Sequence, residues 1–177
     1  HTIPQAIDMI EDAAAKGYET TVNIMAISQA QEGDIAVALD MLGKTPVNAF
    51  YIVDSYGSIY PEEMTRVADM YMEVANKYGK KVGIHAHNNQ QLAFANTIEC
   101  CGCGVDYLDA TYSGMGRGAG NCYIESLIGF LHNPKYNLYP VIQFIENYIN
   151  PMKEEGITWG YDMQYLFTGL LNRHPKS

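Results

Sequence analysis

Two histidines, His85 and His87, are the residues of this sequence whose type and spacing most clearly suggest chemistry. They lie in the apolar segment 81–87, which we expect to form a β-strand. Side chains two positions apart in a strand point to the same face, so both imidazoles would project side by side. Such a pair presents two nitrogen donors to one metal ion, although two polar histidines that only close a strand end would have the same spacing.

The position of the pair along its expected strand agrees with a functional role. His85 and His87 stand at the carboxyl end, where parallel α/β folds bind their ligands. Asp54 directly follows the preceding expected strand, 49–53, and would reach the same end of the sheet. It could bind the metal, orient a histidine as an outer carboxylate, or close a turn.

A glycine-rich loop, Gly114–Gly120, follows the next expected strand and precedes Asn121. Unhindered backbone amides in front of a helix attract phosphate or carboxylate, so we expect Gly116, Gly118 and the Arg117 side chain to form an anion site. The loop also satisfies a relaxed dinucleotide pattern, which leaves a nucleotide-binding α/β module as an alternative. That alternative needs a further strand ending in an acidic residue about 20 positions on, and helical patterns follow instead.

Apolar β-branched segments alternate with helical patterns along most of the chain. The expected strands are 20–27, 49–53, 81–87 and 105–111. This alternation predicts an α/β fold with a parallel sheet and right-handed crossovers. Four βα units fit either an open sheet or half of a (β/α)₈ barrel, here residues 1–132. Residues 133–177 are expected to form a C-terminal helical segment, with a helix break at Asn150-Pro151.

Composition and charge limit the kinds of partner that the protein can bind and the cellular compartment in which it is expected. The chain has 177 residues, with 11 Lys and Arg against 20 Asp and Glu, and a net charge of −9. This acidic balance argues against nucleic acid or an anionic membrane as a partner. No apolar run approaches the roughly 20 residues that span a bilayer. The four cysteines lie too close together in the sequence for a disulfide framework, which predicts a reducing, cytoplasmic location.

Three segments, taken in order, carry a resemblance to a known family. Asp54-Ser-Tyr-Gly57, Gly83–Asn89 and Asp109–Asn121 resemble the metal-dependent aldolase/lyase barrels typified by 4-hydroxy-2-oxovalerate aldolase, with 3-hydroxy-3-methylglutaryl-CoA lyase as a relative. The resemblance covers roughly residues 20–131. It implies the C-terminal half of a TIM (β/α)₈ barrel and carbon–carbon bond cleavage or formation on a 2-oxo-acid-like substrate.

The same resemblance implies roles for individual residues. His85 and His87 would be ligands of a divalent ion, with Asn121 as a further ligand or near-ligand. The ion would commonly be Mn²⁺ or Mg²⁺, and the mixed donor set also suits Zn²⁺ or Co²⁺. It would stabilise the enolate that carbon–carbon cleavage produces. Tyr161 and Tyr165 are both candidates for the tyrosine that the aldolases use from their C-terminal segment.

The sequence also departs from the family pattern. The family's first strand carries a metal-binding aspartate beside an arginine, and a catalytic histidine follows early; this sequence contains no such strand. Asp54 is the carboxylate expected to face the substrate or to support the metal ligands. Arg117 stands near the place where the lyases have a cysteine. We therefore expect a piece of a longer enzyme that lacks its N-terminal half, or a homo-oligomer; a catalytically incomplete binding or regulatory protein is the alternative.

Overall fold

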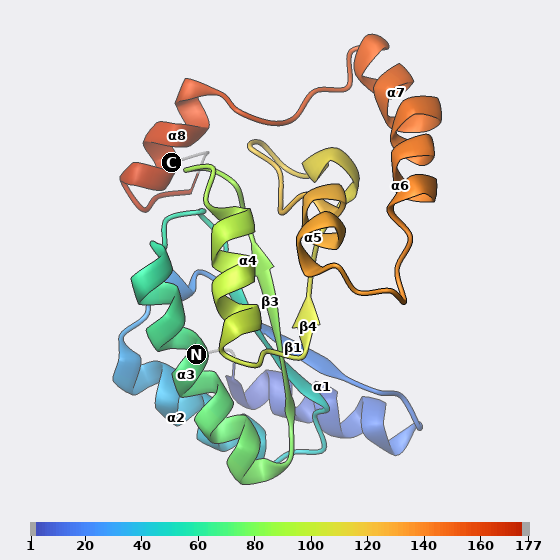
Figure 1. Ribbon diagram of the computed structural model, residues 1–177. Coiled ribbons are helices and arrows are strands. Elements are labelled where there is room, and N and C mark those ends of the chain that lie inside the picture. Colours follow the sequence, from blue (N-terminus) through green and yellow to red (C-terminus); the bar gives the residue numbers. More distant parts are fainter. Residues whose placement is uncertain (1–2, 175–177) are drawn as a thin grey trace.

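The computed structural model describes residues 3–174 and is built around one parallel sheet (Figure 1). The strand order is β1-β2-β3-β4, with bounds Thr21–Ile24, Ala49–Asp54, Lys81–Ala86 and Tyr107–Leu108. Every neighbouring pair of strands is parallel. The predicted parallel α/β fold is therefore confirmed.

Helices join the strands in the expected alternation. Their bounds are α1 Ile3–Ala15, α2 Glu32–Gly43, α3 Pro61–Tyr78, α4 Ala93–Gly102 and α5 Ile124–Leu131. The two outer strands are shorter than the predicted 20–27 and 105–111. The chain leaves β1 by a left-handed residue, Ala26, with φ 52°, and it leaves β4 for a short 3₁₀ turn, Tyr112–Gly114. Strand propensity alone does not reveal these turns.

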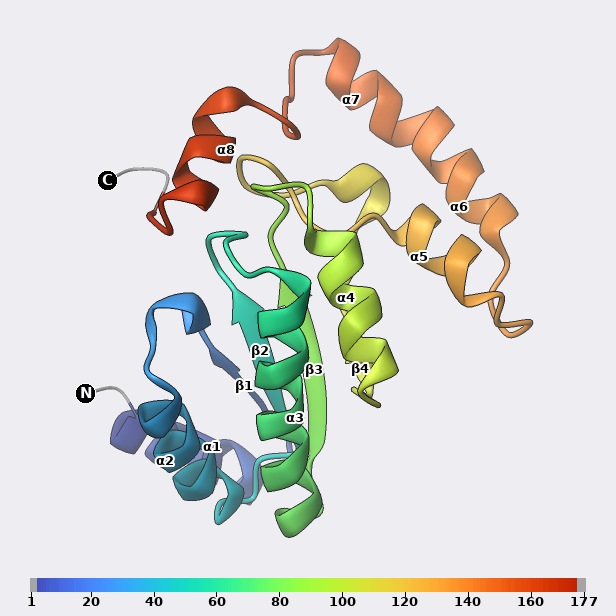
Figure 2. The ribbon, with the colours of Figure 1, turned by 60° about the vertical axis from the view of Figure 1, so that its left-hand side comes forward.

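The two faces of the sheet differ in what covers them. Paired residues of parallel strands point to the same face, and Phe50, Ile52, Val82 and Ile84 share the one that α3 and α4 cover (Figure 2). All four are fully buried in the hydrophobic core. The opposite face, which includes Thr21, Asn23 and Tyr107, is exposed at these three positions. His85 lies on this exposed face.

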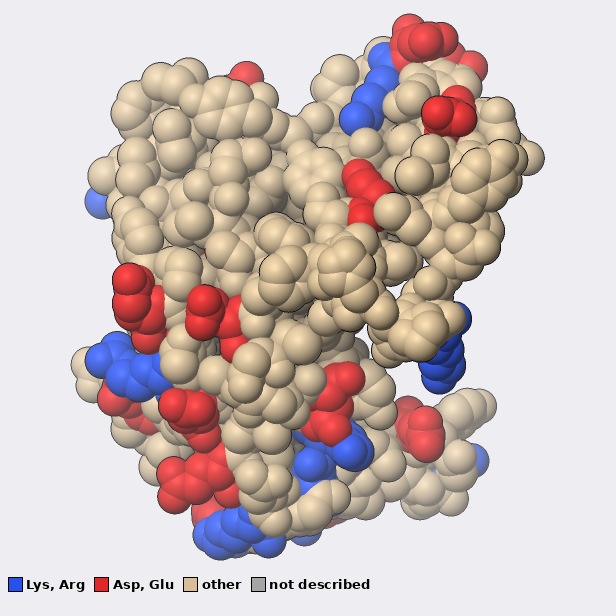
Figure 3. All heavy atoms as spheres, viewed as in Figure 1, with Lys and Arg blue, Asp and Glu red and all other residues tan. Residues whose placement is uncertain are grey.

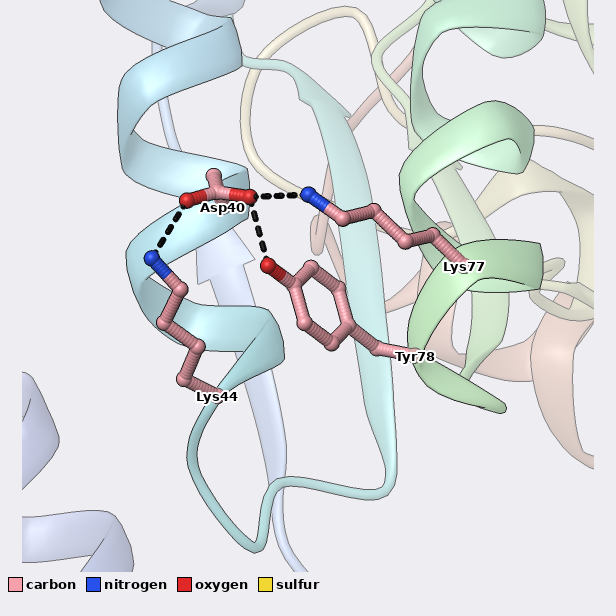
Figure 4. A network of polar contacts seen from close by, with 4 residues as sticks. All are labelled: Asp40, Lys44, Lys77 and Tyr78. Atoms are coloured by element: carbon pink, nitrogen blue, oxygen red, sulfur yellow. Dashed lines mark hydrogen bonds and ion pairs between the residues drawn. The ribbon is translucent and has the colours of Figure 1, made fainter.

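A polar network ties α2 to α3 away from the carboxyl ends of the strands (Figure 4). The Asp40 carboxylate accepts hydrogen bonds from Lys44 Nζ at 2.7 Å, Lys77 Nζ at 2.7 Å and the Tyr78 hydroxyl at 2.6 Å. These donors hold the pKa of Asp40 well below its usual range. The Tyr78 ring also lies against Gly43, where a β-carbon would overlap it. The network therefore sets the distance between the two helices.

The C-terminal segment is a longer helical run than predicted. Helix α6 (Leu138–Phe144), a π-helical turn (Ile145–Ile149) and α7 (Asn150–Glu154) follow one another without interruption, so the predicted break at Asn150-Pro151 is wrong. The π turn bonds the Asn150 N–H to the Ile145 carbonyl, five residues back. This wider turn makes room for the proline ring, which would clash in a regular helix. Helix α8, Met163–Leu170, then returns to the carboxyl end of the sheet (Figures 1 and 2).

Charge is distributed unevenly over the surface. On the face shown in Figure 3, acidic and basic side chains gather around the lower helices and at the tip of α7, whereas the region of α8 carries few. The exposed apolar side chains of α8 are Met163, Phe167 and Leu170. Among the helices within residues 3–174, none has the length and apolar character needed to cross a membrane.

Candidate active site

The two histidines lie together at the carboxyl end of β3. Their ring centres are 5.2 Å apart and the ring planes meet at 78°. A metal ion about 2.1 Å from one nitrogen of each ring, with an angle of about 90–109° between them, needs ring centres about 4.6–5.3 Å apart. The spacing of His85 and His87 therefore fits two ligands of one ion.

The half-buried His87 ring has the protonation state that a metal requires. Burial, followed by the charges of His85 and Arg117, lowers the pKa of His87 to about 4. The ring is thus neutral near pH 7 and keeps a lone pair for a cation. Its Nδ1 atom is buried and has no hydrogen-bond partner among residues 3–174.

Asn121 lies beside His87, because the two residues form an isolated antiparallel bridge between their backbones. The Asn121 side chain donates from Nδ2 to the Met115 carbonyl at 3.1 Å, which fixes the amide orientation. Its Oδ1 atom is buried and, like His87 Nδ1, is unpaired within the described residues. A buried polar atom without a partner costs about 1–3 kcal/mol, so two of them on bridged residues suit a site that receives a ligand.

The donor set fits a divalent ion but is short of negative charge. His85 and His87 supply imidazoles and Asn121 supplies an amide oxygen, a mixture that Mn²⁺, Mg²⁺, Zn²⁺ and Co²⁺ can accept. Within residues 3–174 no cluster of three or more His, Cys, Asp or Glu side chains is arranged to hold a metal.

Asp109 belongs to the site, although the motif analysis did not assign it a role. His85 Nδ1 lies 3.0 Å from Asp109 Oδ2. Ile84 pairs with Leu108, so the next residues along the two strands, His85 and Asp109, lie side by side on the same face. The sequence places Asp109 near the end of the next strand. The register between β3 and β4, which the sequence does not give, is needed to predict its contact with His85.

Two aromatic side chains lie on the same face of the sheet as the contact between His85 and Asp109. Tyr51 and Tyr107 stack with ring centres 6.3 Å apart and planes 3° apart. The Tyr51 ring passes over Gly83, where a β-carbon would overlap it. Burial, and then the neighbouring Asp109 carboxylate, raises the pKa of Tyr51. These two tyrosine rings therefore cover the part of the exposed face that precedes His85 along β3.

Asp54 does not join the histidines. It pairs with Ala86 in the sheet, so its side chain points to the helix-covered face, opposite His85. The carboxylate is fully buried and accepts hydrogen bonds from the backbone N–H groups of Ser58 at 3.0 Å and Ile59 at 3.2 Å. Of the roles considered for Asp54, closing a turn is the one that this geometry supports.

The buried Asp54 carboxyl should make stability depend on pH. Burial raises its pKa from 3.8 to about 6, against the opposing effect of the Ser58 and Ile59 N–H groups. The protonated group therefore stabilises the fold fully below about pH 4, and this contribution is lost as the pH rises through about 6. We expect urea unfolding to show Asp54→Asn gaining about 2–3 kcal/mol relative to the unchanged chain between about pH 4 and pH 7. Parallel pH profiles for the two proteins would contradict this, and Asp8→Asn on the exposed surface of α1 is the control.

The glycine-rich loop closes over the same end of the sheet. A β-carbon at Gly116 would overlap the Asn121 amide, and Gly118, at φ +60°, lies against the Tyr165 ring. Arg117 Nη2 donates to the Ser55 carbonyl at 3.0 Å, so its guanidinium spans from the loop to the end of β2. The backbone N–H groups of Gly116 and Gly118 bond to no other group within residues 3–174. Helix α5 begins only at Ile124, so these amides do not sit at a helix start as a dinucleotide site requires.

The structure separates the two candidate tyrosines. Tyr165 packs on the loop at Gly118, and its carbonyl accepts from Asn89 Nδ2 at 3.2 Å. The Tyr161 side chain is exposed and its hydroxyl contacts Met163 Sδ at 3.2 Å. Just before Tyr161, the Gly160 N–H donates to the Gly118 carbonyl at 2.9 Å and attaches the segment to the loop. Both tyrosines line a cavity with Gly118, and Tyr165 is the one whose ring packs directly against that glycine.

Comparison with known proteins places this arrangement in a family. Residues 1–147 match the family model described as HMGL-like. The chain is 35% identical over 122 residues to an oxaloacetate decarboxylase of Mycobacterium tuberculosis, covering 69% of this chain and 35% of the relative. It is 37% identical over 106 residues to a 4-hydroxy-2-oxovalerate aldolase of Thermus thermophilus, covering 58% and 30%. The chain thus spans about a third of these two curated relatives.

Solved structures agree with the sequence matches. The N-terminal domain of a protein assigned as an aldolase, from Bacteroides vulgatus, superposes with a TM-score of 0.81 at 30% identity, over 99% of this chain and 58% of that one. The HMG-CoA lyase of Bacillus subtilis superposes with a TM-score of 0.74 at 12% identity, over 94% and 59%, which shows a shared fold. The predicted resemblance to aldolase/lyase barrels is confirmed. The chain belongs to the HMGL-like family.

Proposed function

We propose that this chain is the C-terminal half of a divalent-metal-dependent (β/α)₈-barrel lyase that cleaves or forms a carbon–carbon bond in a 2-oxo acid. The observation that carries the proposal is the pair of imidazoles at the end of β3 with the unpaired Asn121 Oδ1 beside it. The names of the curated relatives, an oxaloacetate decarboxylase and 4-hydroxy-2-oxovalerate aldolases, supply the substrate class. Both substrate names denote acids with a 2-oxo group.

The proposed metal site consists of His85, His87 and Asn121. A bound Mn²⁺ or Mg²⁺, or else Zn²⁺ or Co²⁺, would act as a Lewis acid toward the negative charge that develops on the substrate oxygen. His87 would bind in its neutral form, which its burial favours. Asn121 would contribute its unpaired amide oxygen, held in place by the bond from Nδ2 to Met115.

The glycine-rich loop is the proposed site for the substrate carboxylate. The Arg117 guanidinium provides positive charge next to the histidines, as its effect on the pKa of His87 indicates. The free N–H groups of Gly116 and Gly118 would add hydrogen bonds to the same anion. Tyr165, packed on Gly118, is the proposed proton-transferring residue; Tyr161 would need to turn away from Met163 to take that role.

The proposal includes a partner for the exposed face of the sheet. In a complete barrel the face that carries His85, Tyr51 and Tyr107 would be the interior. This chain covers 30–35% of the two curated relatives described above, which leaves room for four further βα units. We propose that these units, in the same polypeptide or a second chain, cover this face and supply the acidic metal ligand. A second copy of this chain is the other candidate.

A cytoplasmic location is part of the proposal. All four cysteines, within the part of the chain that is described, are free, and Cys100 and Cys122 are buried. Burial raises the pKa of both thiols, to about 12 and about 11, which keeps them unreactive. Free thiols agree with a reducing compartment.

A metal-binding protein without catalysis is the second candidate function. The observation that favours it is that no group of three or more His, Cys, Asp or Glu side chains within residues 3–174 is arranged to hold a metal. Such a protein would bind the same metal ion and the same class of 2-oxo acid at this site but would not convert the acid.

Binding of oxalate to the Mn²⁺-loaded chain tests the proposed function. Oxalate is a flat dicarboxylate that resembles the enolate of a 2-oxo acid. We expect calorimetry to detect oxalate binding when Mn²⁺ is present and none when it is absent, because the ion and Arg117 would hold the ligand together. Mn²⁺ binding with no response to oxalate would contradict the proposed substrate class.

Turnover then separates the two candidate functions. The chain would be produced together with the first four βα units of the Thermus thermophilus relative. Pyruvate release from oxaloacetate and from 4-hydroxy-2-oxovalerate, dependent on Mn²⁺, is the expected result for a lyase. A stable complex that binds Mn²⁺ and oxalate but releases no pyruvate would instead support the binding protein.

A further inference from the structure

We infer that Asp109 is a positioning residue that fixes the His85 ring in the tautomer and orientation needed to bind a metal. The inference rests on the proposed metal site and deepens it, because it explains why one of the two imidazoles has a dedicated carboxylate. Asp109 directly follows β4, whereas the histidines lie at the end of β3.

The contact itself dictates the tautomer. An ionised carboxylate can only accept hydrogen bonds, so at 3.0 Å from Asp109 Oδ2 the His85 Nδ1 atom must carry the proton. In the neutral ring the lone pair then resides on Nε2. A metal-binding histidine in proteins usually donates its other N–H to a carboxylate or carbonyl in this way. His85 is therefore prepared to coordinate through Nε2.

The backbone of Asp109 is held in place by the pairing between β3 and β4, which positions its carboxylate. The Asp109 N–H donates to the Ile84 carbonyl at 3.0 Å, which continues the β3–β4 pairing for one residue beyond β4. Tyr51 also interacts with the Asp109 carboxylate from below. Register thus fixes Asp109 directly beside His85.

A purely structural role explains the contact less well. The side chains of His85 and Asp109 are 27% and 43% exposed, and a pair this open to water adds little to folding stability. The Nδ1 atom of the half-buried His87 ring, by contrast, is buried and has no hydrogen-bond partner in the described part of the chain. A carboxylate therefore orients only the His85 ring, whose direction packing alone would leave less restricted.

The tautomer can be measured without any metal. Long-range ¹H–¹⁵N NMR of the metal-free chain, at a pH where His85 is neutral, should show the proton on Nδ1. Asp109→Ala should shift the proton toward Nε2, the site that a free imidazole prefers. Asp109→Asn should keep it on Nδ1, because the amide oxygen still accepts. An identical His85 tautomer in the unchanged chain and Asp109→Ala would overturn the inference.

Metal affinity provides the second readout. Titration with Mn²⁺ and with Zn²⁺ should show Asp109→Ala binding about 10–100-fold more weakly, with Asp109→Asn in between. Asp8→Ala, which removes an exposed carboxylate on α1, should bind like the unchanged chain. Equal affinity of Asp109→Ala and the unchanged chain would overturn the role of Asp109 alone. Absence of binding by the unchanged chain would instead overturn the proposed metal site.

Discussion

Replacing His85 or His87 by alanine should weaken Mn²⁺ binding by more than about 100-fold, because loss of a direct ligand exceeds the 10–100-fold cost of losing an outer partner. The two rings lie 5.2 Å apart at the end of one strand, so each variant leaves a single imidazole beside Asn121. Isothermal titration of the two variants and the unchanged chain, under identical conditions, measures the effect.

A third histidine provides the matched control. His132 is exposed beyond the end of α5, outside the site, and His132→Ala removes the same chemical group. It should bind Mn²⁺ as the unchanged chain does. If all three alanine variants bound alike, the ion would not be held by the His85–His87 pair. Circular dichroism of each variant verifies that the fold is retained.

Gly120→Ala should lower the free energy of unfolding by about 2–4 kcal/mol. Gly120 has φ +82°, and a β-carbon there would overlap the Gly114 carbonyl oxygen, a backbone atom that cannot move aside cheaply. The Gly120 carbonyl also accepts from the Asn88 N–H at 2.8 Å, which ties the loop to the segment that follows β3. Displacing the loop should therefore also weaken Mn²⁺ binding at the neighbouring Asn121.

The control for this variant shares the strained backbone without the overlap. Gly156 has φ +94°, and a β-carbon there would meet nothing within 4 Å. Gly156→Ala should cost only about 1 kcal/mol, the penalty of a left-handed alanine. Thermal and urea unfolding compare the two variants. Equal losses would show that backbone conformation, and not the contact with Gly114, determines the effect.

The architecture was largely predictable from periodicity. The buried strand β2 is a continuous apolar run over residues 49–53, and α3 begins at Pro61 and is followed by Gly79, so both elements are recognisable from the sequence. The predicted helix break at Asn150-Pro151 is wrong because the π turn that precedes Pro151 makes room for the proline ring. The local composition gives no signal for that turn.

The histidine spacing could be interpreted from the sequence because it depends on one strand only. The relation of Asp54 and Asp109 to the pair depends on register between strands, which loops and packing set. Asp54 pairs with Ala86, one position beyond His85, and its side chain therefore points to the helix-covered face. Asp109 lies opposite His85 itself, so the two side chains meet. The register therefore places Asp109, and not Asp54, beside His85.

Electron spin-echo spectroscopy of the Mn²⁺-loaded chain tests the central claim most directly, because it detects nitrogen atoms bonded to the ion. The account predicts couplings to two imidazole nitrogens, reduced to one in His85→Ala and in His87→Ala. A spectrum with water ligands only, or one that either substitution leaves unchanged, would contradict it.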